Sequence, residues 1–389
     1  MKAVRWLIVL GLSTLAAFAD TWPTFHGDFS LSGYSKADVP TKPKLRWLYD
    51  AQSPVHAAPV ADAYRLYVAM KKGDIHALNF KGKYLWSYAH SNETGSIRMA
   101  APVTAYSFTP LRIRTIEGEC REIREQSVIA AYVDGTIRAF DGMAGDPRWS
   151  QKIEGPIKST PLVYRTTGPD ATVIVMNQPS GSLHAFDLLT GAARWQQDGP
   201  ERADGHLALS RDTLAFGSCA AALHTLPADG NTPFTSISLG EGAEVAGGVV
   251  LHDGHVYSGN RGGSIVAADL SAGSNVWINT DWSGELFTTP AVDGKHLVAV
   301  NGYGSVVCLD LATGKRLWIN EAEATDAKAP VIAGNSVVAS IDGTLVILGL
   351  SDGKERWRYE ISDEITSPSI IEGMILVGTD EGQVLAFGE

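Results

Sequence analysis

The sequence predicts an all-β fold, a β-propeller of eight four-stranded blades. Two observations support this most directly: a repeat containing Gly and Trp recurs along the chain, and an unmatched Trp strand near the N-terminus complements an unfinished repeat at the C-terminus. Helical periodicity is nearly absent, and short alternating runs between glycines are typical of strands. A repeat length of roughly 40 residues is typical of propeller blades.

The repeat reads Gly, any residue, aliphatic, any residue, Ala, Leu or Phe, Asp or Asn, then a second Gly and a Trp. Six copies start at Gly73, Gly135, Gly181, Gly263, Gly304 and Gly343 and end at Trp86, Trp149, Trp195, Trp277, Trp318 and Trp357. The step from Gly to Trp is 13 residues in the first copy and 14 in the other five. A seventh, degenerate copy has Ala221 in the first Gly position and Phe234 in place of Trp.

The ends of the chain complete each other. An eighth copy begins at Gly382, but the chain stops at Glu389 before any Trp, whereas residues 44–49 contain Trp47 with no copy before them. We therefore expect the strand around Trp47 to complete the last blade and close the ring. Eight aromatic residues are then predicted to dock between blades, one per blade: Trp47, Trp86, Trp149, Trp195, Phe234, Trp277, Trp318 and Trp357.

Each repeat is predicted to form four short antiparallel strands. In the best-defined blade these are residues 291–292, 296–300, 305–310 and 316–319, with turns at Gly294, Gly304 and Gly314. Hairpin turns require positive φ angles, which glycine adopts without steric cost. The small residue at the Ala position leaves space for a Trp ring to lie flat between neighbouring blades.

The N-terminus has the pattern of a secretory signal. Lys2 and Arg5 precede a short apolar run, and Ala17-Phe18-Ala19 is an Ala-x-Ala cleavage site, so we predict a signal peptide over residues 1–19 and one propeller domain over residues 20–389. A retained interfacial anchor is the alternative. The apolar run is shorter than the ~20 residues that span a bilayer, so no transmembrane segment is expected after cleavage. No lipobox cysteine lies near the cut, and the predicted location is the periplasm or the exterior.

Charge and cysteine content restrict the partners. Cleavage removes two of the 32 basic residues and leaves 43 acidic ones, a net charge near −13 that repels nucleic acid and anionic membranes. The three cysteines are too few for a disulfide scaffold, and an odd number cannot all pair within the chain. We expect a chain that is monomeric by itself and binds a protein or peptide partner.

The Gly-x-aliphatic-x-Ala-Leu-Asp…Thr-Gly…Trp motif resembles the tryptophan-docking motif of the PQQ-like, or quinoprotein alcohol dehydrogenase-like, β-propeller family. The resemblance covers nearly all of the chain after residue 19 and implies eight blades and export. Two branches of the family matter. Quinoprotein dehydrogenases hold pyrroloquinoline quinone and Ca²⁺ with an adjacent cysteine pair, and this chain has no adjacent cysteines. The BamB-type propeller of outer-membrane β-barrel assembly is a scaffold without cofactor, and this chain is similar to it in size and repeat.

Motifs for catalysis are missing from the sequence. It contains no Gly-x-Ser-x-Gly elbow, no phosphate-binding Gly-x-x-x-x-Gly-Lys loop and no zinc-type cysteine spacing. The run His252-Asp253-Gly254-His255 resembles a metal ligand pair, but it coincides with a predicted hairpin turn. We therefore predict no catalytic residue, no metal site and no cofactor, with PQQ and Ca²⁺ as the alternative.

Charged residues recur where the chain enters each blade beside the central channel. They are His56, Arg98, Lys158 and His206 in the first four blades and Glu244, Glu285, Asp326 and Glu364 in the last four. One half of this rim would be basic and the other acidic, an arrangement that orients a dipolar ligand or a peptide. Ordinary solvated loop charge is the competing interpretation.

An insert over residues 107–127 lengthens the second blade. Its alternation of aliphatic and basic residues predicts a projecting hairpin with Arg112, Arg114, Arg121 and Arg124 on its strands. Exposed strands pair with partners by edge addition, and a plain surface hairpin is the alternative. The sequence therefore favours an exported, non-enzymatic propeller that binds protein or peptide as a scaffold, with cell-envelope assembly as the expected setting. A quinoprotein oxidoreductase and a binder of small molecules or glycans are the alternatives.

Overall fold

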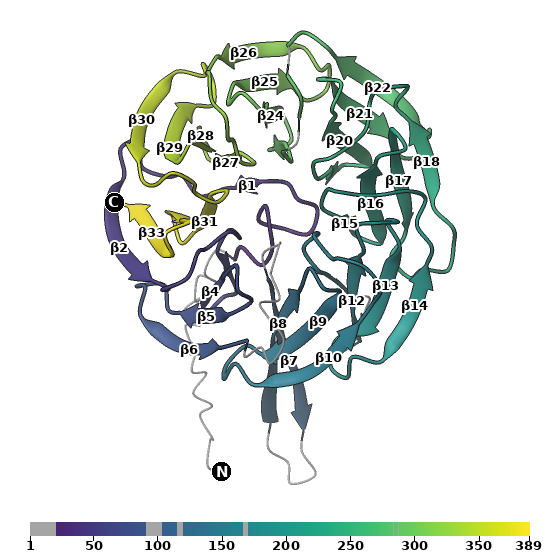
Figure 1. Cartoon of the computed structure of the whole chain (residues 1–389), viewed down its shortest axis with the longest axis vertical. Helices are drawn as coiled ribbons and strands as arrows, with labels where there is room; N and C mark the ends of the chain where they lie inside the picture. The colour runs from purple at the N-terminus through teal and green to yellow at the C-terminus, as the bar shows by residue number, and fades with distance from the viewer. Residues whose placement is uncertain (1–20, 91–102, 115–119, 166–169, 283, 287) are drawn as a thin grey trace, which may run out of the picture.

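The computed structural model describes residues 21–90, 103–114, 120–165, 170–282, 284–286 and 288–389. Every regular element in these ranges is a β-strand, and the sheets form a ring of eight blades (Figure 1). The predicted all-β, eight-bladed fold is confirmed. None of the described residues forms a helix long and apolar enough to cross a membrane. The predicted signal peptide, residues 1–19, lies outside the described residues.

In the first four blades the strands run in chain order from the channel outward. Blade one contains β3 (Val60–Ala61), β4 (Leu66–Ala69), β5 (Ile75–Leu78) and β6 (Tyr84–Tyr88). Blade two contains β7 (Thr104–Arg114), β8 (Cys120–Ala131), β9 (Thr136–Asp141) and β10 (Pro147–Lys152). Blade three contains β11 (Leu162–Arg165), β12 (Ala171–Met176), β13 (Leu183–Asp187) and β14 (Ala193–Gln197). Blade four contains β15 (Ala208–Ser210), β16 (Thr213–Ser218), β17 (Ala222–Pro227) and β18 (Thr235–Ser238).

The remaining blades follow the same order, with one strand added and one supplied by the N-terminus. Blade five contains β19 (Val250–His252), β20 (His255–Gly259), β21 (Ile265–Asp269) and β22 (Ser274–Asn279). Blade six contains β23 (Ala291–Val292), β24 (His296–Val300), β25 (Val306–Asp310) and β26 (Arg316–Asn320). Blade seven contains β27 (Val331–Ala333), β28 (Ser336–Ile341), β29 (Thr344–Gly349) and β30 (Glu355–Glu360), with β1 (Tyr34–Ser35) parallel to β27. Blade eight contains β31 (Ser369–Ile371), β32 (Met374–Gly378), β33 (Gln383–Gly388) and β2 (Lys44–Asp50).

The N-terminal strand closes the ring as predicted. Strand β2 pairs antiparallel with β33, with Trp47 opposite Ala386 and Asp50 opposite Gln383. The last blade is thereby built from strands near both ends of the chain, and β2 and β33 lie side by side in Figure 1. Such closure leaves only short, protected sheet edges.

Burial explains why the middle strands of each blade are almost entirely apolar. Every residue of β4 and β12 is buried, because these strands pack against a neighbouring blade on both faces. The outermost strands are more exposed; β30, for example, is exposed at every residue except Trp357. The hydrophobic core is accordingly divided into clusters that lie between adjacent blades.

Six predicted docking tryptophans lie against the turn glycine of the next blade. They are Trp47 on Gly82, Trp86 on Gly145, Trp149 on Gly191, Trp195 on Gly230, Trp277 on Gly314 and Trp318 on Gly353, and a Cβ added at these glycines would lie 2.4–2.7 Å from the indole. Several of these rings also donate their N–H to the next blade, as Trp318 does to the carbonyl of Leu350 at 2.7 Å. Trp357 packs on Phe387 of blade eight, with ring centroids 5.7 Å apart.

Phe234 does not occupy the docking position that we predicted for it. A Cβ added at Gly273, the corresponding turn glycine of blade five, would meet no atom within 4 Å. Phe234 packs instead inside blade four, edge-on to Phe216 at 6.2 Å and to His224 at 6.0 Å. Thr235, not Phe234, pairs with Thr225 at the position where other blades place their Trp, as Ala185 opposite Trp195 shows, so the contact between blades four and five has no docked ring.

Residues 21–35, the N-terminal strap, cross the centre of the ring (Figure 1). Trp22 exchanges two main-chain hydrogen bonds with Ala61 of blade one, at 2.8 and 3.0 Å. Carbonyls farther along the strap accept hydrogen bonds of 2.6–3.0 Å from inner-strand amides of five more blades: Ala105, Leu209, Leu251, Val292 and Ile332. The strap therefore joins six blades and occupies the central channel.

The insert in blade two forms the predicted hairpin. Strands β7 and β8 stay paired from Thr104 opposite Ile129 to Arg114 opposite Cys120, with an irregularity between Phe108 and Leu111. They extend beyond the ring in Figure 1. Arg112 and Arg114 belong to β7 and Arg121 and Arg124 to β8, and their side chains lie outside the described part of the structure.

Candidate functional site

The two faces of the ring differ in the loops they carry. On one, the mouth face, lie the loops that lead into the innermost strand of each blade and the turns between the second and third strands. The β7–β8 hairpin extends from the other end of an innermost strand, so it lies on the opposite face. The rim residues and the hairpin Arg residues therefore belong to separate surfaces.

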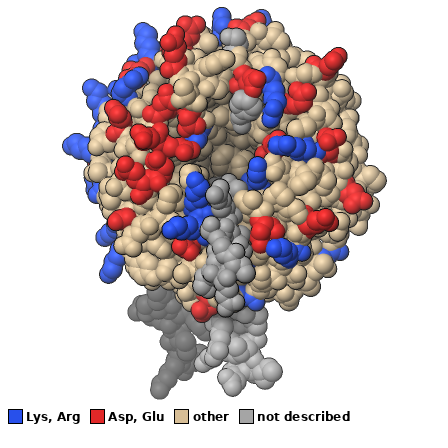
Figure 2. All heavy atoms as spheres, in the orientation of Figure 1, with Lys and Arg blue, Asp and Glu red and all other residues tan. Residues whose placement is uncertain are grey.

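A central funnel opens on the mouth face, where Figure 2 shows a hollow. Its cavity measures about 230 Å³. The walls come from blades four to eight, and Phe25 of the strap forms part of the lining together with Asp204, His206, Ala246, Thr288, Lys328 and Ser367. Because the strap occupies the channel below, a ligand reaches this cavity from the mouth face.

The bottom of the funnel is a stack of aromatic rings. The ring of Phe25 lies parallel to that of His206, with centroids 4.1 Å apart. The main-chain amide of Thr160 donates to Nδ1 of His206 at 3.2 Å. Burial lowers the pKa of His206 to about 3, so this ring is neutral at pH 7. Although His206 was predicted as a basic rim residue, it acts as an uncharged packing group.

The other rim residues do not share one structural position. Isolated β-bridges mark equivalent sites at Val55, Ile157, Ala327 and Ile365. His56 and Lys158 follow the bridge residue, whereas Asp326 and Glu364 precede it. Because successive side chains of an extended segment point to opposite sides, these two pairs face different directions. The predicted split of the rim into a basic and an acidic half therefore grouped residues from two different structural positions, one before and one after the bridge residue.

Glu244 and Glu285 occupy the same position as Asp326 and Glu364. In each of these blades the residue's carbonyl accepts a main-chain hydrogen bond of 2.9–3.1 Å from the turn after the second strand, donated by Arg261, Gly302, Asp342 and Asp380 respectively. The acidic half of the rim is therefore a real structural series. Lys158 is exposed, and Arg98 lies outside the described residues.

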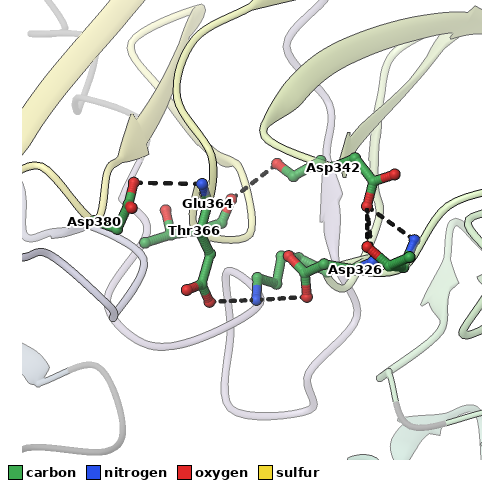
Figure 3. A network of polar contacts seen from close by, with 8 residues as sticks. Asp326, Asp342, Glu364, Thr366 and Asp380 are labelled. Carbon is green, nitrogen blue, oxygen red and sulfur yellow. Dashed lines mark hydrogen bonds and ion pairs between the residues drawn. The ribbon is translucent and has the colours of Figure 1, made fainter.

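Lys328 completes the rim and was missed by the sequence analysis. Its Nζ lies 2.9 Å from Oδ1 of Asp326 and 2.8 Å from Oε1 of Glu364, so it joins blades seven and eight (Figure 3). Burial alone would lower the pKa of Lys328, but the two carboxylates raise it above its usual value. Alignment on the aliphatic bridge residues would have found Lys328, since it follows Ala327 as His56 follows Val55.

Two further carboxylates organise the loops around this pair. Oδ1 of Asp342 accepts from the main-chain amides of Thr325 and Asp326 at 2.9 and 2.8 Å, and Asp380 accepts from the amide of Glu364 at 3.3 Å (Figure 3). The pKa values of Asp342 and Asp380 are lowered. These residues belong to a group of acidic side chains that gather on the left of the mouth in Figure 2, over blades seven and eight.

On the other side of the mouth, Asp204 forms a second polar cluster. Arg202 Nε donates to both carboxylate oxygens at 3.0 and 3.1 Å, and the Gln178 amide also donates to Asp204. Burial alone would raise the pKa of Asp204, but these hydrogen bonds bring it below its usual value. The rim thus presents paired charges on both sides of the funnel.

Metal-binding residues do not converge in the described ranges: no group of three or more His, Cys, Asp or Glu side chains could hold an ion there. His252-Asp253-Gly254-His255 forms the turn between β19 and β20, with positive φ at Asp253 and Gly254. Cys219 and Cys308 are free thiols, and burial raises the pKa of Cys308 to about 12.

Comparison with known proteins gives matches in sequence and in structure. A family model described as outer membrane protein assembly factor BamB matches residues 223–389. BamB of Bordetella pertussis is 24% identical over 260 residues, which cover 64% of this chain and 60% of that protein. The alignment therefore spans less than two thirds of the relative's own length.

Solved structures extend the likeness to the whole ring. BamB from Moraxella catarrhalis superposes with a TM-score of 0.69 at 18% identity, covering 89% of this chain and 98% of that one. Quinohemoprotein alcohol dehydrogenase from Comamonas testosteroni superposes with a TM-score of 0.70 at 15% identity, covering 95% and 81%. At these identities the structural likeness concerns the fold alone. From its repeats, its closed ring and these matches, this chain is an eight-bladed β-propeller that is similar to the PQQ-like, BamB-type propellers.

Proposed function

We propose that this chain is an exported, non-enzymatic propeller that binds polypeptide in the cell envelope and serves in outer-membrane protein assembly. The match of residues 223–389 to the BamB family model is the observation that carries the proposal. The matched part includes the acidic rim residues Glu244, Glu285, Asp326 and Glu364 together with Lys328. The mouth face is therefore the surface that we assign to partner binding.

The chemistry of the mouth supports binding over catalysis. The amine of Lys328 is held between two carboxylates at 2.8–2.9 Å, and His206 is an uncharged ring stacked on Phe25. Groups paired in this way present fixed charges and hydrogen-bonding atoms to a partner, and such complementarity gives specificity and orientation. A rigid ring of blades can hold such groups in fixed positions, as a scaffold protein requires.

We propose further that the protein works without a quinone cofactor. The side chains that face the funnel do not fit a site for pyrroloquinoline quinone and Ca²⁺, because the strap contributes Phe25 to its floor and the nearby carboxylates Asp326 and Glu364 are engaged by Lys328. The β7–β8 hairpin, with Arg112, Arg114, Arg121 and Arg124, stays a predicted second contact surface on the opposite face.

Site-specific photocrosslinking in the native host tests the proposal. Asp363 is exposed next to Glu364 on the mouth face, and Ser351 is exposed in the turn between β29 and β30 on the opposite face. A photoreactive phenylalanine analogue at Asp363 is expected to crosslink to a component or a client of outer-membrane protein assembly. The same analogue at Ser351 is the matched control. Crosslinks of equal yield from both positions would remove the mouth face from the proposal, and no polypeptide crosslink from either would refute it.

A further inference from the structure

A second cavity lies on the mouth face between blades six and seven, outside the central funnel. Its volume is about 820 Å³. The lining comes from loops of this face: Asp281 and Trp282 before blade six, Asn301, Tyr303 and Ser305 around the turn of blade six, and Glu321 to Thr325 before blade seven, with Arg316 and Ile319 from β26. The cavity is much larger than the funnel's and has no counterpart in the sequence predictions.

Hydrogen bonds fix the walls of this cavity. The main-chain amide of Ala324 donates to the carbonyl of Tyr303 at 2.8 Å. Ser305 Oγ accepts from the amide of Ala322 at 3.1 Å and donates to its carbonyl at 3.2 Å. These bonds tie the loop before blade seven to the turn of blade six. A site that is already formed loses little conformational entropy when a ligand binds.

The lining combines aromatic surface with negative charge. The side chain of Tyr303 is 60% exposed, and Asp281, Glu321 and Glu323 are exposed as well. Arg316 is the one basic residue of the lining, and it donates to the main-chain carbonyl of Asp281 at 2.9 Å. Within the described ranges, no ion pair engages the carboxylates of Glu321 and Glu323. The lining therefore carries a net negative charge that is available to a cation.

Trp282 is a buried aromatic residue of the cavity wall. This residue belongs to the cavity wall and is 9% exposed, and its indole N–H has no acceptor among the described residues. A buried donor without an acceptor costs about 1–3 kcal/mol. The indole nitrogen itself is closed to solvent, so Trp282 serves as part of the wall and its N–H signal reports on changes there.

We propose that this cavity binds an extended polypeptide segment that carries an arginine. The guanidinium group stacks on the ring of Tyr303 and pairs with Glu321 and Glu323, beside the cavity wall that Trp282 helps to form. Arginine suits the site better than lysine because its planar group stacks on aromatic rings and forms forked hydrogen bonds with carboxylates. The inference rests on the proposed function, since it names the chemistry of one polypeptide that the mouth face recognises.

Titration of the indole N–H signals tests this site directly. The protein contains 10 tryptophans, so Trp282→Phe identifies the signal of Trp282 in an NMR spectrum of the ¹⁵N-Trp-labelled chain. The capped peptide Ac-Ala-Ala-Arg-Ala-Ala-NH₂ is expected to move this signal with saturation. The corresponding Glu peptide is expected to bind at least about tenfold more weakly, because like charges are placed together.

Charge-removing variants provide the control. E321Q/E323Q is expected to weaken the Arg peptide by about fivefold or more, since it removes both carboxylates that pair with the guanidinium. E372Q/E389Q removes two exposed carboxylates elsewhere and is expected to leave the affinity unchanged. A Trp282 signal that does not move, or equal weakening in both double variants, would overturn the site. If the site is overturned in this way, the crosslinking experiment at Asp363 still decides the proposed function. Crosslinks to assembly components would leave that function standing, and their absence would refute it.

Discussion

A chain that begins at residue 50 is expected to melt roughly 10 °C or more below the chain that begins at residue 21, because it lacks the strap and the closing strand. Strand β2 supplies the outer strand of blade eight through its pairing with β33. Trp47 on this strand lies on Gly82 and donates to the carbonyl of Phe80 at 3.2 Å, which joins blade eight to blade one. The midpoint is measured by circular dichroism at constant scan rate.

A second truncation separates the two contributions. A chain that begins at residue 37 keeps β2 but loses the strap, whose hydrogen bonds reach six blades. It is expected to melt between the other two chains, because the ring stays closed while buried Trp22 and Leu31 are removed. Identical midpoints for all three chains would contradict both the ring closure by β2 and the role of the strap.

Gly314→Ala is expected to destabilise the protein by about 1–3 kcal/mol more than Gly273→Ala, the range that overpacking of a core costs. Both glycines occupy the same turn position, with φ of +66° and +63°, so the backbone strain of the new Cβ is shared. At Gly314 this Cβ would lie 2.5 Å from the indole of Trp277, and at Gly273 it would meet no atom within 4 Å. The difference therefore measures the docking contact alone.

Urea unfolding of the two variants gives the comparison, with the midpoint and the slope fitted for each. Equal losses would mean that the docked ring moves aside at no cost, and that the indole–glycine contact contributes nothing to the stability of the blade interface.

The interface between blades four and five lacks this docking contact, because no ring lies on Gly273 and Phe234 packs inside blade four. We therefore expect the ring of blades to open first at this interface.

The sequence was sufficient for the fold because its signals are local. Turn glycines need positive φ, and Gly73, Gly135 and Gly304 have it; each precedes the Trp of its repeat by 13 or 14 residues, the length of two short strands and their turn. The pairing of β2 with β33 was also predictable, since an unfinished repeat requires a partner. The prediction for Phe234 failed because spacing along the chain does not fix strand register: Thr235, one residue later, pairs with Thr225 at the position that the docking tryptophans occupy.

The candidate site was less predictable because its contacts join blades. The strap contributes Phe25 to the funnel through main-chain hydrogen bonds, which leave no side-chain pattern in the sequence. His206 appeared to be a basic residue, but its burial against Phe25 makes it neutral. Lys328 was hidden because the loop before blade seven is one residue shorter between Ala327 and Pro330 than the loop between Val55 and Pro59.

The central claim is a propeller that binds polypeptide and needs no quinone, and a thermal melt with and without pyrroloquinoline quinone plus Ca²⁺ tests it most directly. A ligand that binds the folded state at a hundredfold excess over its Kd stabilises it by about 2.7 kcal/mol. We predict a midpoint that stays unchanged within the error of the measurement. A reproducible upward shift that requires both quinone and Ca²⁺ would contradict the account and identify the chain as a quinone-binding protein.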